Sequence, residues 1–447
     1  MQRFIMFYNR EDELSTLENE YKKDTSSFTV IYGRRRVGKT ALIQEYIKNK
    51  PAIFFYATEA NILIQLENLK SQILNLINKP YLKDISLQSI EQLFALIEEY
   101  DFQKKLVFVI DEYQNLAKLD KSISSRLQAI WDISLKSKNI HLILCGSVVS
   151  MMHSEVLDYS APLYGRRTSS IHLKQLQFRY IKDFIPNLSL EDQMRVFASF
   201  GTIAKYLETY DGKKTFYENV KDNILNKNSF LYSEGYFLLK QELNDLTNYF
   251  SILESISKGE TKIGNIASKL QVPVTHLTRY LSKLIDLDIL TKETPITEPN
   301  PLKSKNGRYK FKDNFLAFWF FYVYKNYNFL EINQIDVVLQ EIEQNFNDRF
   351  VSFAFEDYIK EDILYNPEKY LDFIPLKAGR WWNNKEEIDI IAFDDENIAF
   401  IECKWQNSPT SKKAEAELIK KSLPLIGDKT PSYKVITKED YLNKSNV

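Results

Sequence analysis

The segment Gly33-Arg34-Arg35-Arg36-Val37-Gly38-Lys39-Thr40 has the spacing G-x-x-x-x-G-K-[ST] of a phosphate-binding loop. An apolar run that ends at Tyr32 precedes it, and residues from Ala41 to Lys50 follow with helical spacing. In such a loop, backbone N–H groups and the N-terminus of the following helix hold phosphates. Lys39 would reach the β- and γ-phosphates, and the Thr40 hydroxyl would hold Mg²⁺. The segment therefore predicts a nucleoside triphosphate site.

An acidic pair, Asp111 and Glu112, ends the apolar run Leu106–Ile110 further along the chain. After a phosphate-binding loop, such a pair is typical of a Walker B strand, in which the first acid holds Mg²⁺ and the second polarises the attacking water. The adjacent glutamate favours hydrolysis of the nucleotide over its storage. The alternative is an ordinary acidic junction between a strand and a turn.

Two other residues are candidates for the same site. Ser147 ends the apolar run His141–Cys145 and would either sense the γ-phosphate or merely cap the strand. Arg166 would either stabilise charge on the phosphates, in this subunit or from a neighbouring one, or form a surface pair. Action from a neighbour would require a homo-oligomer. The three arginines of the loop, residues 34–36, are expected on its exposed side rather than against a partner.

A second group of charged residues interrupts two very apolar runs near the C-terminus. Asp389 lies in the first run, and Glu402 and Lys404 lie two apart in the second, so their side chains share a face. Antiparallel pairing would bring the three together, and Glu356 on the preceding helix would add a metal contact. Two carboxylates can bind Mg²⁺ or Mn²⁺, and a lysine beside them can position water. The pattern predicts a metal-dependent phosphodiesterase; the alternative is a hairpin with a charged solvent face.

The elements that must position the first group alternate between strand and helix. Such alternation, with apolar strands, predicts a parallel sheet covered on both faces over residues 1–175. The expected strands are Thr29–Tyr32, Ala52–Ala57, Leu106–Ile110, His141–Cys145 and Ser170–Leu173. The expected helices between them include Leu63–Asn78, Leu87–Tyr100 and Ile123–Ser137.

Three further regions are expected after residue 175. Residues 176–243 have only helical spacing and are interpreted as a lid, with helices at Phe178–Phe184, Leu190–Tyr210 and Thr215–Leu225. Residues 244–308 predict a winged helix-turn-helix, with helices at Ile252–Ser257, Lys262–Leu270 and Thr275–Leu287 and a β-wing within Leu290–Lys312. Residues 309–447 predict a separate α/β domain, with helices at Phe315–Tyr324, Phe346–Asp362 and Lys413–Leu423 and strands at Ile388–Phe393, Ile398–Lys404 and Tyr433–Ile436.

Basic residues on the second helix of the helix-turn-helix and on the wing are candidates for contact with DNA phosphates. They are His276, Thr278, Arg279 and Lys283 on the helix, and Lys303, Lys305, Arg308, Lys310 and Lys312 on the wing. Because the net charge is −1, any DNA contact must come from such a local patch. The alternative is a wing that docks within the chain.

Composition limits the class of protein. The 447 residues, 44% hydrophobic and 27% charged, are typical of a globular protein of two to four domains. Cys145 and Cys403 lie in apolar runs and are expected to be reduced thiols. With no signal-peptide pattern and no uncharged run of 18 apolar residues, we expect a cytoplasmic location and no membrane contact.

These residues together resemble the archaeal-type P-loop ATPases of the AAA-like, STAND-related group, over essentially the whole chain. Gly33–Thr40 is similar to that family's arginine-rich P-loop, Val109–Glu112 to its Walker B strand, and Leu163–Arg167 to a further family pattern. Tyr309–Phe320 is similar to the junction into the family's C-terminal domain. Phe200–Leu207 departs from the pattern, where the family usually has a second glycine and a proline. The resemblance implies that the nucleotide is ATP.

The C-terminal domain of that family is similar to PD-(D/E)XK nucleases, which implies a restriction-endonuclease-like fold and DNA as a partner. Asp389, Glu402 and Lys404 fall on the D…E-x-K core of that motif. The leading hypothesis is thus a Mg²⁺-dependent ATPase with a winged helix and a metal-dependent nuclease domain. The alternative is a nucleotide-controlled switch whose nuclease-like domain only binds DNA or a protein. A small-molecule kinase would leave the C-terminal residues unexplained.

Overall fold

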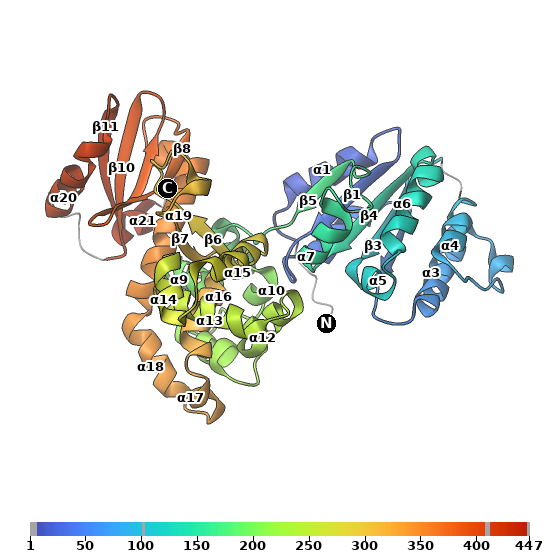
Figure 1. Ribbon diagram of the computed structural model, residues 1–447, viewed down its shortest axis with the longest axis horizontal. Helices are drawn as coiled ribbons and strands as arrows, with labels where there is room; N and C mark the ends of the chain where they lie inside the picture. Colours follow the sequence, from blue (N-terminus) through green and yellow to red (C-terminus); the bar gives the residue numbers. More distant parts are fainter. Residues whose placement is uncertain (1–6, 101–102, 407–411, 445–447) are drawn as a thin grey trace. The chain divides into compact units, whose positions relative to one another are not determined.

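The apolar runs of the N-terminal region form one five-stranded sheet in the order β2-β3-β4-β1-β5. The strands are β1 (Ser27–Tyr32), β2 (Ala52–Tyr56), β3 (Leu106–Asp111), β4 (Ile140–Gly146) and β5 (Ser169–His172). Every neighbouring pair is parallel (Figure 1). The predicted α/β fold with a parallel sheet is confirmed. Because β4 lies between β1 and β3, the ends of all three strands meet at one edge.

The computed structural model describes residues 7–100, 103–406 and 412–444. The chain divides into two compact units, Met1–Leu176 and Gln177–Val447. The finer division into a lid, a winged helix and a C-terminal domain stays a prediction. None of the helices in these described ranges combines the length and the apolar composition needed to cross a bilayer.

Helices cover both faces of the five-stranded sheet. α1 (Glu11–Tyr21) and α2 (Lys39–Ile47) bury Leu17, Leu42 and Tyr46 against one face. The opposite face is covered by α3 (Ile62–Ile77), α4 (Ile90–Ile97), α5 (Gln114–Leu119), α6 (Ile123–Ile133) and α7 (Val149–Met152). Short turns of 3₁₀ helix at Pro80–Leu82 and Leu135–Ser137 and a π-helical turn at His153–Leu157 complete the unit. Helix α1 was not predicted from the sequence.

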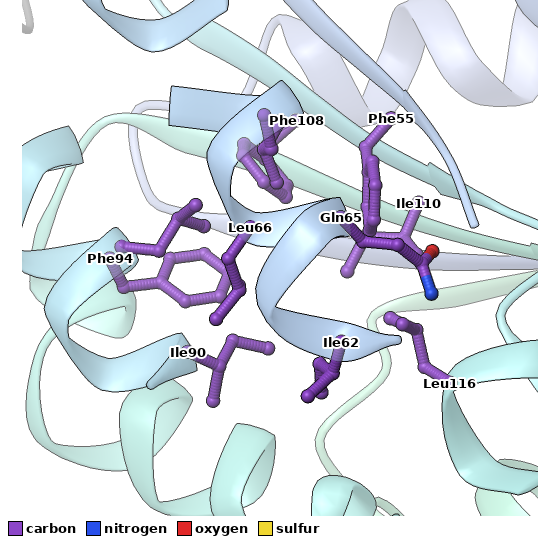
Figure 2. A pocket seen from close by; sticks show the side chains of 11 residues that line it. Phe55, Ile62, Gln65, Leu66, Ile90, Phe94, Phe108, Ile110 and Leu116 are labelled. Carbon is purple, nitrogen blue, oxygen red and sulfur yellow. The ribbon is translucent and has the colours of Figure 1, made fainter. Parts of the chain in front are cut away.

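The layer formed by α3 and α4 encloses a small apolar cavity (Figure 2). Phe55, Phe108 and Ile110 of the sheet line it from one side, and Leu66 and Phe94 line it from the helices. Gln65 is the polar member of the lining, and its amide nitrogen donates to the backbone carbonyls of Thr58 and Ala60. With an internal volume of about 10 Å³, the cavity is a packing defect of the core and not a ligand site.

The region from Gln177 to Leu243 is helical, as predicted, but with different bounds. Its elements are the 3₁₀ turn Phe178–Tyr180, α8 (Ile181–Phe184), α9 (Leu190–Ser199), α10 (Ala204–Leu207), α11 (Phe216–Val220), the π-helical turn Lys221–Leu225 and α12 (Phe230–Glu242). The single helix expected over Leu190–Tyr210 is wrong. Gly201 has a φ of 68°, a left-handed conformation that ends α9 before α10 begins.

Three helices and an antiparallel strand pair follow. They are α13 (Leu246–Ser257), α14 (Ile263–Leu270), α15 (Val274–Asp286), β6 (Leu290–Glu293) and β7 (Arg308–Phe311), with a 3₁₀ turn at Pro301–Lys303. Gln271 is left-handed, with a φ of 55°, and ends α14, while Pro273 precedes the first turn of α15. The expected short break between these two helices is therefore present.

A run of aromatic residues begins the next segment. It forms α16 (Asn314–Phe318) and the π-helical turn Trp319–Tyr324, and it is followed by α17 (Tyr327–Glu331), α18 (Ile335–Phe346), the π-helical turn Asn347–Val351, α19 (Ser352–Tyr365) and the 3₁₀ turn Pro367–Lys369. Trp319 is fully buried, and its indole N–H donates to the carbonyl of Tyr232 on α12. This segment packs α12, α13 and α18 around one aromatic core.

A second sheet completes the chain, with the strand order β11-β10-β9-β8. Its elements are β8 (Lys377–Trp382), β9 (Glu387–Phe393), β10 (Asn397–Lys404), α20 (Lys412–Ser422), the 3₁₀ turn Leu423–Leu425, β11 (Thr430–Thr437) and α21 (Lys438–Lys444). Strands β8, β9 and β10 are antiparallel, and β11 is parallel to β10 (Figure 1). Strand β8 was not predicted, because glycine and arginine interrupt its apolar pattern.

The hairpin formed by β6 and β7, with its connecting residues 294–307, is fixed to β8. The backbone N–H of Ile296 donates to the carbonyl of Arg380 at 2.8 Å, and the indole N–H of Trp382 donates to the carbonyl of Asn306 at 3.2 Å. A Cβ added to Gly379 would lie 3.2 Å from the Ile296 side chain, so the hairpin packs closely on the strand. We refer to residues 290–311 below as the hairpin.

The aromatic core gives a first testable prediction. In Gly235→Ala on α12, the new Cβ would lie 2.4 Å from the Trp319 ring, so we expect a loss of about 1–3 kcal/mol in unfolding free energy. In Gly264→Ala on α14, no atom lies within 4 Å of the new Cβ, and we expect a gain of up to about 1 kcal/mol. Chemical denaturation of both variants measures the two changes. Equal changes in unfolding free energy in the two variants would contradict the close packing of Gly235 against Trp319.

Candidate functional site

The loop between β1 and α2 needs both of its glycines. Gly33 has a φ of 151°, and a Cβ there would lie 2.2 Å from the carbonyl oxygen of Leu173. Gly38 has a φ of 98° and stands directly before α2, where a side chain would be strained. The backbone can therefore take this course only with glycine at both positions.

Lys39 lies inside the loop. Its ammonium donates to the carbonyls of Gly33 and Arg34, both at 2.8 Å, and the side chain is almost completely buried. Burial lowers the pKa of Lys39, while the nearby Glu112 and Asp111 carboxylates oppose that shift. A buried cation at the N-terminus of a helix is suited to bind an anion such as a phosphate.

Thr40 and Asp111 meet at the edge of the sheet, as the sequence predicts. The Thr40 hydroxyl donates to Asp111 Oδ2 at 2.8 Å, and Asp111 Oδ1 accepts the backbone N–H of Glu112 at 2.9 Å. The Asp111 carboxylate is thereby fixed beside the phosphate-binding loop. A hydroxyl and a carboxylate oxygen at this separation are the kind of donors that Mg²⁺ accepts.

Glu112 is held by two polar side chains. Its Oε2 accepts the Ser147 hydroxyl at 2.6 Å and also the side-chain amide of Gln114. The same amide lies 3.3 Å from the Ser147 hydroxyl, and the Glu112 backbone is left-handed, with a φ of 56°. The position of β4 between β1 and β3 explains why Ser147 reaches this carboxylate. Gln114 was missed by the sequence analysis, and the only signal for it was its place just after the acidic pair.

The three loop arginines do not share one environment. Arg34 is buried, Arg35 is exposed and Arg36 is half-buried, so the expectation that all three lie on the exposed side is wrong for Arg34. The loop turns inward at this residue because its carbonyl accepts the buried Lys39 ammonium.

Arg10, which directly precedes α1, was also missed. Its guanidinium donates to the carbonyl of Val37 at 3.0 Å and to that of Lys174 at 2.6 Å, and the residue is buried. Arg10 therefore ties the phosphate-binding loop to the segment that follows β5. No spacing in the sequence indicates this role, because the contact joins positions far apart in the chain.

The structure pairs Arg166 with α6. Its guanidinium lies 3.0 Å from Asp132 Oδ2 and donates to the carbonyl of Tyr164 at 3.1 Å. The adjacent Arg167 donates to the carbonyls of Val156 and Leu157. These contacts correspond to the surface pair that the sequence left open as the alternative for Arg166.

The predicted pairing of the C-terminal acids is present in the second sheet. Asp389 on β9 accepts the backbone N–H of Cys403 on β10 at 2.8 Å, which places it between Glu402 and Lys404. The Lys404 ammonium lies 2.6 Å from Glu402 Oε1. Glu402 Oε2 is buried and has no hydrogen-bond partner among the described residues. A buried carboxylate oxygen without a partner is suited to bind a cation.

The carboxylates of this region affect one another's protonation. Burial raises the pKa of Asp389 to about 6, and the Glu402 charge adds to that shift. Burial raises the pKa of Glu356 to about 8; Arg380 opposes this shift and Asp389 adds to it. Carboxylates that resist ionisation in this way are stabilised by any added positive charge.

Glu356 does not join Asp389 and Glu402 as a ligand set. Its Oε2 accepts the Arg380 guanidinium at 2.6 Å. Within the described ranges, no group of three or more His, Cys, Asp or Glu side chains is arranged to hold a metal ion. The expected metal contact of Glu356 stays a prediction, and in this conformation an arginine of β8, a strand that was not predicted, binds its carboxylate.

The basic residues proposed for DNA contact fall into two groups. Arg308 lies 2.8 Å from Glu387 and stacks on Trp382, Lys310 lies 2.8 Å from Asp357, and Lys312 pairs with Asp288. These three residues, two in the hairpin and Lys312 just after it, are paired within the chain, as the docking alternative anticipated. The others remain accessible to solvent: His276, Thr278, Arg279, Lys303 and Lys305 are exposed, and Lys283 is half-buried.

Comparison with known proteins identifies the family. The family described as an ATPase domain predominantly from Archaea matches residues 7–210. A second family, of archaeal and bacterial proteins of unknown function, matches residues 319–419. An uncharacterised protein of Methanocaldococcus jannaschii is 36% identical over 447 residues, which cover 99% of this chain and 97% of that protein. The chain belongs to this family of archaeal ATPases.

Two further similarities agree with this assignment. An uncharacterised ATP-binding protein of M. jannaschii is 44% identical over 50 residues, which are 11% of this chain and 85% of that protein. The Walker-type ATPase of Pyrococcus abyssi has a similar fold, with a TM-score of 0.50 and 22% identity, over 70% of this chain and 96% of that one. This member of the family is therefore an ATP-binding, ATPase-like protein.

The contacts of Glu112 give a second testable prediction. Ser147→Ala removes a hydrogen bond to the Glu112 carboxylate, so we expect kcat for ATP hydrolysis to fall about tenfold to a hundredfold. KM for ATP is expected to stay within about twofold, because Ser147 does not line the glycine loop. Steady-state kinetics measure both. Ser154→Ala, at an exposed serine of the π-helical turn His153–Leu157, is the control and is expected to match the unmodified protein.

Proposed function

We propose that this protein is a Mg²⁺-dependent ATPase that acts on DNA through its C-terminal region. The observation that carries the ATPase part is the meeting of Lys39, Thr40, Asp111 and Glu112 at one edge of the parallel sheet. Lys39 would neutralise phosphate charge, and Thr40 and Asp111 would hold Mg²⁺. When bound, Mg²⁺ would supply a counter-charge for the transferred phosphoryl group.

Glu112 would orient and polarise the attacking water. Ser147 and Gln114 both bond Oε2, and because a carboxylate is a rigid planar group, they restrict Oε1 as well. A carboxylate held in this way needs little reorganisation when water binds. A contribution of Arg166 to stabilising charge on the phosphates, in this subunit or from a neighbouring one of an oligomer, would require its release from Asp132.

Two substitutions test the ATPase proposal. Lys39→Ala is expected to lower nucleotide affinity at least about tenfold, and Glu112→Gln to keep binding but lower kcat at least about a hundredfold. Nucleotide binding by calorimetry and phosphate release at saturating Mg²⁺–ATP measure the two effects. Lys48→Ala, at the exposed end of α2, is the matched control. Normal hydrolysis in Glu112→Gln would contradict the role given to Glu112.

For the C-terminal region we propose a winged helix and a PD-(D/E)XK nuclease-like domain. The order α19, β8, β9, β10, α20, β11, with three antiparallel strands and one parallel strand, supports the second assignment. Asp389 and Glu402 would hold Mg²⁺ or Mn²⁺, and Lys404 would position water beside them. The free oxygen of Glu402 supports a cation at this place.

DNA would be contacted by the exposed face of α15. Helices α14 and α15 are separated by a short turn, and His276, Thr278 and Arg279 lie on the solvent side of α15. Such a helix can enter the major groove, while nearby lysines contact phosphates. The hairpin would contribute through its exposed Lys303 and Lys305, because Arg308 and Lys310 are paired with acids of the chain and Lys292 donates to the Ser304 carbonyl.

A cleavage assay tests the nuclease proposal. Linear and circular DNA are incubated with the protein in Mg²⁺ or Mn²⁺, with and without ATP. Asp389→Asn and Lys404→Ala are expected to lose cleavage by at least about a hundredfold and to keep ATP hydrolysis. Lys413→Ala, at an exposed lysine of α20, is the matched control. Cleavage that persists in Lys404→Ala would contradict the assignment.

One observation favours a second function, that of a nucleotide-controlled switch that binds DNA or a protein without cleaving it. The Glu356 carboxylate is bound by Arg380, so the third acid is withheld from the site. DNA binding that weakens with salt, together with ATP hydrolysis and intact DNA in both metals, would support the switch over the nuclease.

A further inference from the structure

Glu356 is connected to the hairpin by a network of ion pairs. Lys310 of β7 lies 2.8 Å from both Glu293 of β6 and Asp357 of α19, and Lys360 of α19 lies 3.1 Å from the same two acids. Arg380 of β8 completes the network. Residues from the hairpin, α19 and β8 therefore share one set of charges.

Arg380 is the member of this network that touches the C-terminal site. Its guanidinium lies 2.6 Å from Glu356, 3.4 Å from Asp357 and 3.8 Å from Glu293. The side chain is 9% exposed, so these contacts are formed away from bulk water. Because a buried guanidinium interacts strongly with every carboxylate near it, three acids compete for one cation.

Carboxylates crowd the space around Arg380. Glu293, Glu356 and Asp357 lie within 3.8 Å of its guanidinium, and helix α19, which carries Glu356, packs against β9 and β10, which carry Asp389 and Glu402. Removing Arg380 would leave Glu356 unpaired beside Asp389. Those carboxylates, with Glu402 Oε2, would then form a stronger site for a divalent cation.

We propose that Arg380 is a positioning residue that withholds Glu356 from the C-terminal cation site, and that Glu293 of the hairpin competes with Glu356 for the Arg380 guanidinium. The proposal rests on the proposed cation binding by Asp389 and Glu402. Metal affinity at that site then depends on where the hairpin lies. A ligand of α15 that displaced the adjacent hairpin would change the affinity without touching the site.

The connection from α15 to Arg380 is short and direct. Strand β6 begins shortly after α15 ends, and Glu293 is its last residue. The hairpin also bonds β8 through the Ile296 N–H and the carbonyl of Arg380 itself. Movement of the hairpin would therefore act on both the backbone and the side-chain partners of Arg380.

A metal titration of the full chain tests the proposal. Mn²⁺ binding is followed by electron paramagnetic resonance, and the C-terminal site is defined as the binding lost in Asp389→Asn. Arg380→Met is expected to bind Mn²⁺ at this site about tenfold more tightly, because Glu356 is released. Glu293→Gln is expected to bind it severalfold more weakly, because Arg380 then has fewer competitors for Glu356.

Two variants control for charge and for folding. Lys377→Met removes one positive charge from an exposed side chain of the same strand, β8, and it is expected to stay within about twofold of the unmodified protein. Arg380→Lys keeps the charge and is expected to stay close to the unmodified protein. Thermal melting shows which variants are folded. If Arg380→Met does not fold, the weaker Mn²⁺ binding expected in Glu293→Gln still tests the competition.

The outcomes separate the inference from the site on which it rests. Two results would overturn the competition and leave the cation site intact. One is a Mn²⁺ affinity in Arg380→Met that is equal to or weaker than that of the unmodified protein, and the other is an unchanged Mn²⁺ affinity in Glu293→Gln. Mn²⁺ binding that appears only in Arg380→Met would support the withholding of Glu356. The absence of Asp389-dependent binding in every variant would overturn both the site and the inference.

Discussion

The parallel pairing of β1 with β4 and β5 is the constraint on which the nucleotide site depends. It aligns Tyr32 with Gly146 on one side and with His172 on the other, so three strands end at the same level. The chain leaving β1 must then turn against the Leu173 carbonyl, which only Gly33 allows. The positions of Lys39, Asp111 and Ser147 follow from that arrangement. Asp111 is the last residue of β3, Ser147 comes directly after β4, and Lys39 begins α2.

The two carboxylate sites of the chain are stabilised in opposite ways. Glu112 is held by neutral donors, Ser147 and Gln114, which orient the carboxylate without forming an ion pair with it. Glu356 is held by a buried guanidinium, which favours its ionised form against the opposing effect of burial. The first arrangement suits a group that must act on water, and the second suits a group whose charge is controlled by its neighbours.

The sequence was sufficient for the features that depend on local pattern. Apolar runs predicted all five strands of the first sheet, and glycine and lysine spacing predicted the loop between β1 and α2. The alternation of Glu402 and Lys404 predicted their shared face, and the structure pairs them. These predictions were accurate because strand periodicity and loop conformation are set by neighbouring residues.

Features that depend on contacts between distant positions could not be predicted in this way. Arg10 reaches the carbonyl of Val37, and Arg380 reaches Glu356, through packing that no spacing encodes. Strand β8 was missed because Gly379 and Arg380 interrupt its apolar pattern, although both are needed there by the hairpin and by α19. The basic hairpin was assigned to DNA because its acidic partners lie elsewhere in the chain.

The close packing of the hairpin on β8 has another consequence, for solubility. Strand β8 lies at one edge of the second sheet, and an uncovered edge offers backbone groups with which a strand of another chain can pair. The Ile296 N–H and the side chain of Ile296 occupy that edge. The opposite edge, β11, carries Pro431 and Lys434, and both residue types disfavour such pairing. The hairpin thus protects the sheet from aggregation, and a chain shortened within it would lose that protection even if every strand still formed.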